Sequence, residues 1–343
     1  MKVTLDSIAA IAGVSAATVS RSLQQSRLIH PATRAHVLDV AMRLGYQGRS
    51  RRGTGSKRPA STLGVLLPFR SIKSGHMDTM HCLQGITSEA DAADMLLNLE
   101  EVRSQAKSHM GSRKFLPKMV KDRLVDAVIL MEPHTTSDVI ELSRLVPIVS
   151  IQYEYEEATT DMVECANARG VKRLFDHLTT LGHRRISWVR ASFKASFFRD
   201  REAGFIQGCL DYDLPFDRSL LLQTPCPEEN PEELRQQLTQ ALKQGTTAFL
   251  CASDLAAEQV ARELLLMGVK IPDEVSIAGY DATEVKIDGK RLTSFDPLFI
   301  EIGRAAVRVA IQRMAEPSSP PIIQMRCGKI FPGETVGATA AIA

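Results

Sequence analysis

The sequence predicts an all-α head with three short helices in a helix-turn-helix arrangement, followed by an α/β body with two parallel-sheet lobes. Three observations support this division. Residues 1–46 hold short helical patterns, residues 47–61 are rich in Gly, Ser and Arg, and residues 62–343 alternate short apolar runs with longer helical patterns. Alternation of this kind is typical of parallel sheets covered by helices.

Charge is distributed unevenly along the chain. Residues 1–58 contain ten Lys or Arg and two Asp, a net charge of +8, whereas the other residues contain 32 basic and 38 acidic side chains, a net charge of −6. A basic head on an acidic body indicates that the head alone binds a polyanion. A basic, unfolded leader is the alternative, but the apolar pattern favours a folded head.

The first helix of the head is predicted to follow Thr4. Thr4 suits the N-cap position, and Asp6 suits the first turn, where a carboxylate interacts favourably with the helix dipole. One face is apolar and consists of Leu5, Ile8, Ala9 and Ala12. Gly13 can adopt the left-handed conformation that ends a helix, and Ser15 can cap a second helix over residues 16–23.

The second helix combines an apolar side with a slender polar side. Val19 and Leu23 are its predicted core residues, and the outward residues are Ala16, Ala17, Ser20 and Arg21. A helix of this shape, placed after a glycine turn, can enter the major groove of DNA. A third helix is predicted between Pro31 and Gly45, with the apolar stripe Val37, Leu38, Ala41 and Leu44.

Several short runs of the head follow one register without a gap: Val3–Leu5, Ala12–Ser15, Thr18–Arg21, Thr33-Arg34 and Leu44–Tyr46. Together they resemble the lactose-repressor (LacI/GalR) family of bacterial transcriptional regulators. The resemblance implies sequence-specific binding to a double-stranded DNA operator. It also implies a homodimer, since one three-helix head offers few base contacts.

Residue chemistry and this resemblance predict the DNA contacts. Arg21 can donate two hydrogen bonds to guanine N7 and O6, which discriminates by roughly 1–3 kcal/mol. Ala16 and Ala17 offer apolar contact, for example with a thymine methyl. The side chains suited to phosphate contacts are Thr4, Ser15, Thr18, Ser20 and Tyr46. Each of these hydroxyls can alternatively cap a helix or remain solvated.

The linker, residues 47–61, is basic and rich in glycine. Arg49, Arg51 and Arg52 are predicted to follow phosphates or to enter a narrow minor groove. In the family a hinge helix usually places a leucine in the minor groove, and Gly55 occupies that position here. Because glycine disfavours helix formation, we expect an altered hinge. A solvated tether is the alternative.

The body contains two series of predicted elements. The predicted strands are Leu63–Leu67, Met95–Leu99, Ala127–Met131, Ile148–Ile151, Arg185–Val189, Leu220–Leu222, Ala248–Cys251 and Val275–Ala278. Helical patterns lie near 79–93, 113–123, 137–145, 168–181, 197–211, 231–244, 254–267 and 297–314. Two such series imply two lobes, and ligands favour the crevice at the C-terminal ends of parallel strands.

Matching runs continue through the body: Gly64–Pro68, Val125–Leu130, Leu181–Ile186, Arg201–Phe205, Ala252–Asp254, Gly268–Ile277, Gly279–Asp281 and Glu301–Gly303. They are similar to the same family, whose body resembles periplasmic sugar-binding proteins. The resemblance implies an effector-binding and dimerisation domain over 62–343. Lobe one is expected at about 62–163 and 294–323, and lobe two at about 164–293 and 324–343.

A small, carbohydrate-like effector is expected between these lobes. Arg201 and Asp281 are the leading candidates, because both fall at family pocket positions and suit a polyhydroxylated ligand. The full candidate set is His76, Asp78, Arg201, Ser253, Asp254, Asp281 and Phe299. His76 and Asp78 lie in a stretch longer than the usual loop after the first strand. Asp254 or Asp281 can instead be a structural carboxylate, and Arg201 a surface arginine.

Other patterns argue against several protein classes. The six cysteines show no metal-binding spacing, so neither a metal nor another cofactor is expected. No apolar run approaches the ~20 residues of a membrane span. The apolar stretch Ile8–Val14 fits a helix rather than a signal peptide, which predicts a cytoplasmic protein that joins the nucleoid when bound to DNA.

Two other functions remain as alternatives. A solute-binding protein would share the body, but the basic head argues against it. An α/β enzyme is the third hypothesis, although the sequence has no P-loop, no GxGxxG after a strand and no GxSxG.

Overall fold

The computed structural model describes residues 4–23, 29–30, 33, 36–37, 40–41, 61–68, 77–102, 116–155, 157–158, 160–192, 195–226 and 230–339. The chain divides into two compact units, a head that ends at Pro59 and a body that begins at Ala60.

The head begins with α1 (Leu5–Ala12), and its predicted caps are confirmed. The Thr4 hydroxyl accepts a hydrogen bond from the Ser7 amide at 3.2 Å, and the Ser7 hydroxyl accepts one from the Thr4 amide at 2.8 Å. Gly13 ends α1 with φ +66°. The next helix, α2 (Ala16–Leu23), follows Ser15, whose hydroxyl accepts a hydrogen bond from the Thr18 amide at 3.1 Å.

A small apolar core holds these helices together. Ile8 of α1, Val19 of α2 and Val37 are fully buried, and Ala9, Ala12, Val40 and Ala41 pack around them. Val37, Val40 and Ala41 are helical, at the spacing of one helix face. Leu38, Leu44 and most of the predicted third helix lie outside the described residues.

The first sheet of the body has the strand order β13–β5–β4–β3–β1–β2, and these strands pair in parallel. Its strands are β1 (Thr62–Pro68), β2 (Leu96–Val102), β3 (Ala127–Leu130), β4 (Ile148–Ile151), β5 (Asp161–Cys165) and β13 (Ile323–Arg326). The sheet with its helices is called the first lobe below.

The second sheet has the order β14–β12–β9–β8–β6–β7. Its strands are β6 (Ile186–Arg190), β7 (Leu221–Gln223), β8 (Ala248–Cys251), β9 (Ser276–Tyr280), β12 (Thr293–Asp296) and β14 (Lys329–Phe331). These strands pair in parallel except that β14 runs antiparallel to β12. A hairpin of β10 (Lys286–Ile287) and β11 (Lys290–Arg291) lies outside this sheet. The sheet with its helices is the second lobe.

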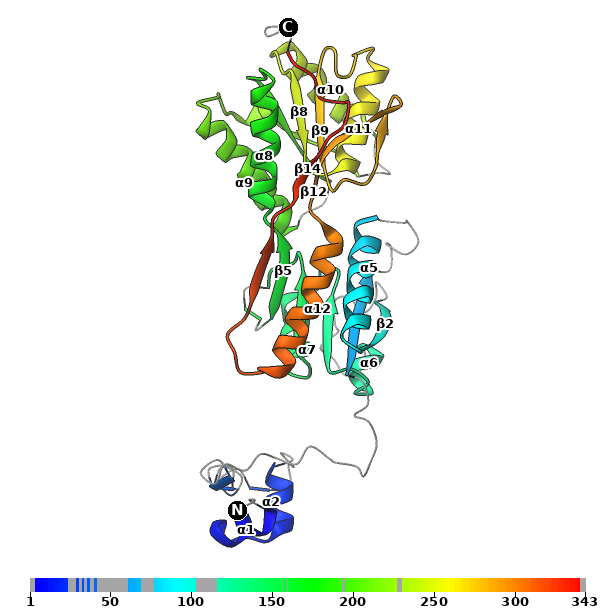
Figure 1. The fold of residues 1–343 in the computed structure, drawn as a ribbon. Coiled ribbons are helices and arrows are strands. Elements are labelled where there is room, and N and C mark those ends of the chain that lie inside the picture. Colours follow the sequence, from blue (N-terminus) through cyan, green and yellow to red (C-terminus); the bar gives the residue numbers. More distant parts are fainter. Residues whose placement is uncertain are drawn as a thin grey trace. The chain divides into compact units, whose positions relative to one another are not determined.

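Helices cover both faces of each sheet (Figure 1). In the first lobe they are α5 (Met77–Ala92) and α12 (Phe299–Ala315) on one face, with α6 (Lys118–Lys121) and α7 (Thr136–Ser143) on the other. In the second lobe α8 (Asn167–Thr180) and α9 (Ser196–Asp211) face α10 (Glu232–Lys243) and α11 (Asp254–Leu266) across the sheet. Side chains of the strands alternate between the two layers, as the period of two requires.

The long helices α5 and α12 lie side by side along the first sheet (Figure 1). Two glycines allow their backbones to approach. A Cβ added at Gly85 would lie 2.0 Å from the carbonyl oxygen of Ile300, and one at Gly303 would lie 2.1 Å from that of Cys82. Neither distance leaves room for a methyl group.

The described part of the body passes between the two lobes after Cys165, after Asp296 and after Arg326. The return to the first lobe therefore covers residues 297–326, about three residues later at each end than the predicted 294–323. Short polar strands explain the offset, because β12 and β13 carry no apolar run that marks them in the sequence.

Three predicted elements need correction. The second strand is Leu96–Val102 rather than Met95–Leu99, because Leu96 pairs with Thr62 at the start of β1. The helix predicted over 113–123 is the single turn α6, with 113–115 outside the described residues. Leu220 belongs to a 3₁₀ turn capped by Asp217, and the strand begins at Leu221.

Candidate functional site

The exposed side of α2 carries the predicted base-reading residues. Arg21 lies in the last turn of α2 with its side chain exposed, and Ala17, one turn earlier, is also exposed. Ala16 differs from the prediction of a fully outward residue, because it is half-buried against the core of the head. The exposed side of α2, which is available to a partner, therefore includes Ala17 and Arg21.

The predicted phosphate-binding hydroxyls of the described head act as local caps. Thr4 caps α1, and the hydroxyls of Ser15 and Thr18 lie 2.9 Å apart at the start of α2. Thr4 and Ser15 are exposed, so each retains an accessible face. The side chain of Ser20 and the whole of Tyr46, Arg49, Arg51 and Arg52 lie outside the described residues.

In the body, the structure brings Arg201 and Asp281 together. Arg201 lies on α9, and Asp281 directly follows β9; the distance between Nη2 and Oδ1 is 3.0 Å. The guanidinium also donates to Oδ1 of Asn167 at 3.0 Å and to the carbonyl of Ala252 at 2.7 Å. Arg201 is only 2 % exposed, so it is a buried residue that connects several elements of the second lobe and not a surface arginine.

Aromatic rings surround the same guanidinium. Its Cζ lies 3.7 Å from the ring centroid of Tyr280, 5.1 Å from that of Phe197 and 5.3 Å from that of Phe198. Such contacts are favourable for a desolvated cation. These rings were not predicted as site residues. The available signal was their position in the chain, since Phe197 and Phe198 shortly precede Arg201 and Tyr280 directly precedes Asp281.

A hydrogen-bond chain extends from this cluster to β5, where the chain crosses between the lobes. Asn167, at the start of α8, donates to the carbonyl of Cys165 at 3.0 Å, and the Cys165 thiol lies 3.3 Å from the Tyr280 hydroxyl. Burial raises the pKa of the Cys165 thiol and raises the pKa of Tyr280 well above its usual value. Both groups are therefore neutral at pH 7, which suits a cluster that already holds Arg201 and Asp281.

The backbone is strained around Asp281. Asp281 has φ +115° and Ala282 has φ +50°, in a region that residues with a Cβ rarely occupy. Gln152, directly after β4, has φ +69° and Leu298, directly before α12, has φ +62°. Strained residues of this kind cost about 1–3 kcal/mol each and cluster at ligand sites and switch regions.

Ser253 and Asp254 lie next to Arg201 but have structural partners. The Ser253 hydroxyl caps α11 by accepting a hydrogen bond from the Ala256 amide at 3.2 Å. Asp254 accepts from the Ser294 hydroxyl at 2.6 Å and from the Thr283 amide and hydroxyl at 2.7 and 2.9 Å. Burial raises the pKa of the Asp254 carboxyl, although these donors oppose the shift.

The other predicted effector residues are not brought to this cluster by any described contact. Phe299 begins α12 and is 7 % exposed, packed within the main apolar core. The side chain of Asp78 lies outside the described residues, although its backbone belongs to α5. His76 also lies outside the described residues.

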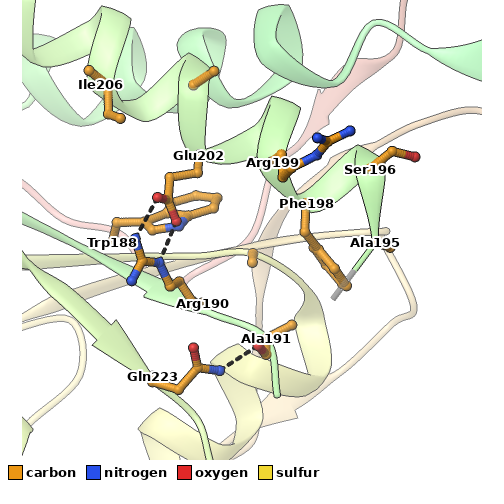
Figure 2. A pocket seen from close by; sticks show the side chains of 12 residues that line it. Trp188, Arg190, Ala191, Ala195, Ser196, Phe198, Arg199, Glu202, Ile206 and Gln223 are labelled. Atoms are coloured by element: carbon orange, nitrogen blue, oxygen red, sulfur yellow. Dashed lines mark hydrogen bonds and ion pairs between the residues drawn. The ribbon is translucent and has the colours of Figure 1, made fainter. Parts of the chain in front are cut away.

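A cavity of about 690 Å³ lies beside this cluster, between α9 and the ends of β6, β7 and β8 (Figure 2). Trp188 and Arg190 reach it from β6, and Phe198, Arg199 and Glu202 from α9. None of the predicted effector residues whose side chains the structure describes lines it. A sequence signal was available, since Trp188 is the only tryptophan of the chain and lies in a predicted strand.

Two family models match the chain. The model for bacterial regulatory proteins of the lacI family matches residues 4–48, and the model for a periplasmic binding protein-like domain matches residues 175–336. The chain belongs to the LacI family. It is therefore a DNA-binding transcriptional regulator with an effector-binding body, and not an enzyme.

Curated relatives support this LacI-family assignment. The chain is 23% identical over 316 residues to the HTH-type transcriptional repressor PurR of Haemophilus influenzae (strain PittEE), with 91% of each protein covered. It is 25% identical over 290 residues to the HTH-type transcriptional regulator DegA of Bacillus subtilis (strain 168), with 82% of each covered.

Solved structures share the fold of this LacI-family chain. A transcriptional regulator CelR–cellobiose complex aligns with a TM-score of 0.67 at 20% identity, covering 97% of this chain and 99% of the other. The lac repressor dimer bound to operator and the anti-inducer ONPF aligns with a TM-score of 0.65 at 22% identity, covering 98% of this chain and 100% of the other.

Among the described residues, no helix has the length and apolar character to span a bilayer.

Proposed function

We propose that this LacI-family chain represses transcription by placing α2 in the major groove of an operator, and that a small polyhydroxylated effector on the body changes its affinity for DNA. The observation that carries the DNA-binding role is the exposed Arg21 on α2, presented by a helix pair with a shared apolar core and a capped start to each helix. PurR relatives are named repressors, which supports the direction of regulation.

The proposed DNA contacts divide by chemistry. Arg21 reads a guanine, with Ala16 and Ala17 contacting bases beside it. The remaining contacts fix the position of the head on phosphates and are assigned to Thr4, Ser15, Thr18, Ser20, Tyr46, Arg49, Arg51 and Arg52. Ala16, being half-buried, contributes a smaller surface than Ala17.

The proposed effector site is built on Arg201 and Asp281, with Ser253 and Asp254 behind them and His76, Asp78 and Phe299 contributed by the first lobe. In the observed state Asp281 occupies one side of the Arg201 guanidinium. A ligand hydroxyl that replaces this contact would release the strained backbone at Asp281 and so favour a second conformation of the lobes. Solved relatives carry cellobiose or ribose, which supports a carbohydrate-like ligand.

The DNA-reading role is tested by Arg21→Ala in the full chain. We expect the affinity for a selected pseudopalindromic operator to fall at least fivefold, because a bidentate contact worth roughly 1–3 kcal/mol is lost. Affinity for random DNA, measured by fluorescence anisotropy at the same salt concentration, should change much less. Arg144→Ala, at an exposed arginine of the body, serves as the control. Equal losses on operator and random DNA would reject base reading by Arg21.

The effector site is tested by a thermal-shift screen of sugars, sugar acids and nucleosides on the full chain. A ligand that binds the native state raises the melting temperature and should change operator affinity. Asp281→Asn and Arg201→Ala should both abolish this response. Arg201→Ala also removes a charged side chain that is almost fully buried, so Asp281→Asn is the decisive variant. A full ligand response in Asp281→Asn would remove this pair from the effector site.

A further inference from the structure

The cavity beside α9 adjoins the Arg201 cluster through Phe198 and Ala252, but the Arg201 guanidinium does not line it. Arg201, Gly204 and Phe205 lie on the buried side of α9. Glu202 and Ala203, on another side of the same helix, line the cavity. We propose that this cavity is a second ligand site, which binds a small aromatic molecule carrying one carboxylate.

The first argument is the apolar character of the walls. Trp188 and Ala191 of the β6 end, Phe198 and Ile206 of α9, and Ala252 after β8 contribute most of the non-polar lining. Trp188 stacks on Phe205, with ring centroids 5.7 Å apart, which holds the indole in place. A volume of about 690 Å³ bounded by flat rings and alanine methyls suits a planar ring system.

The second argument is an unpaired donor. Trp188 is 1 % exposed, and its indole N–H has no hydrogen-bond acceptor among the described residues. A buried tryptophan N–H normally has an acceptor, because leaving it unpaired costs free energy. A ligand in the cavity that brings an acceptor oxygen would satisfy this donor.

The third argument is charge. Arg190 and Glu202 neutralise each other through paired hydrogen bonds of 2.5 and 2.6 Å, which Figure 2 shows at the cavity wall. Among the lining residues that the structure describes, Arg199 is the remaining charged one, and it is exposed. These described residues together carry a net charge of +1, which is complementary to a ligand with one carboxylate.

The same contacts disfavour a sugar in this cavity. The Gln223 amide donates to the carbonyl of Ala191, and the Arg190 guanidinium is held by Glu202. Few polar groups remain to recognise a polyhydroxylated molecule. The Phe198 ring lines the cavity and lies 5.3 Å from the Arg201 guanidinium, so a ligand here would touch one of the aromatic rings that surround Arg201.

Since Trp188 is the only tryptophan, its fluorescence in the full chain reports directly on the cavity. We expect 2-naphthoate to change this emission saturably and to bind at least tenfold more tightly than the neutral 2-naphthamide. D-ribose and octanoate should leave the emission unchanged at the same concentrations. Equal affinity for naphthoate and naphthamide would overturn the carboxylate assignment, and saturable binding of octanoate at the naphthoate affinity would overturn the aromatic one.

Variants measured by calorimetry locate the site. Ala203→Phe fills the cavity and should abolish naphthoate binding, whereas Leu210→Phe, at an exposed residue of the same helix outside the cavity, should preserve it. Trp188→Phe removes the N–H and should weaken binding at least fivefold. Arg199→Gln, at an exposed position of α9, should weaken the binding of naphthoate at least fivefold and leave the binding of naphthamide unchanged. Unaltered naphthoate affinity in Arg199→Gln and Trp188→Phe would refute the proposal.

Discussion

Single residues of the second lobe show how burial decides what a charged side chain does. Arg201 and Asp254 are both nearly inaccessible, and both have several partners from distant parts of the chain. Arg201 connects α9, α8 and the end of β8, while Asp254 connects α11 to β12 and to Thr283. Removing either one leaves several buried groups without a partner.

Asp254→Ala should destabilise the protein by about 3 kcal/mol, because the Thr283 amide and the Ser294 hydroxyl would lose a buried acceptor. Urea unfolding followed by circular dichroism measures the loss. Asp273→Ala, at an exposed aspartate that precedes β9, should change the free energy of unfolding by less than about 0.5 kcal/mol. If the two variants unfold at the same urea concentration, Asp254 does not have this structural role.

At this scale the sequence located the residues but not their partners. The caps Thr4 and Ser15 and the left-handed Gly13 were predictable, because the interactions of a cap are local. The pairing of Arg201 with Asp281 was inferred only through resemblance to a family. Asn167 and Tyr280 complete that pairing from positions 34 and 79 residues away in the sequence, and no local pattern encodes such a distance.

Among the elements, apolar runs made the central strands predictable, and polar composition hid the two strands at one end of each sheet, β13 and β5 in the first and β14 and β12 in the second. β3, β4 and β8 are fully buried and were expected within one residue, whereas β5, β12, β13 and β14 were not expected. β5 is also buried, although it contains Asp161 and Glu164. Asp161 is held by Arg313 at 2.7 and 2.8 Å, and a partner of this kind cannot be inferred from the strand itself.

Glu164 gives β5 a pH-dependent contribution to stability. Burial raises the pKa of this carboxyl to about 7, with smaller effects from Asp200 and Glu154. Because the folded state holds the proton more tightly than the unfolded state, the free energy of unfolding falls as pH rises from about 4.5 to 7. Above pH 7 the carboxylate is ionised in both states and the loss is complete.

Glu164→Gln should therefore raise the melting temperature at pH 8 by several degrees and leave it almost unchanged at pH 4.5. Differential scanning calorimetry over this pH range measures the effect. Glu233→Gln, at an exposed position of α10, is the matched control and should show no such trend. A Glu164→Gln variant with the same pH profile as the parent chain would contradict this account.

At the scale of the whole molecule, an exposed apolar edge of the first lobe bears on how the chain assembles. β2 is an edge strand, and its Leu96 and Leu99 side chains are 58 % and 48 % exposed. Met80, on the neighbouring α5, is also largely exposed. Exposed apolar side chains along a sheet edge are typical of a surface that another molecule covers. We infer that this molecule is a second copy of the chain, because a dimer would supply two heads for two operator half-sites.

The double substitution Leu96→Asp and Leu99→Asp should convert the proposed dimer to a monomer at micromolar concentration, because the charges would oppose burial of this edge. Sedimentation velocity measures the oligomeric state. Leu145→Asp, at an equally exposed leucine beyond α7, should leave it unchanged. A dimer that survives the double substitution would place the interface on another surface.

The three passages between the lobes also determine when each lobe can fold during synthesis. The first five strands of the first sheet can begin to pair once residue 165 has emerged from the ribosome. Helix α12, which packs beside α5 on one face of the sheet, and the edge strand β13 are complete only after residue 326 has been made. At ~5–20 residues per second, the ribosome needs roughly ten to thirty seconds to supply them. During that interval the apolar side chains that α12 will cover are exposed to solvent. The nascent chain is therefore most dependent on chaperones while the second lobe is being made.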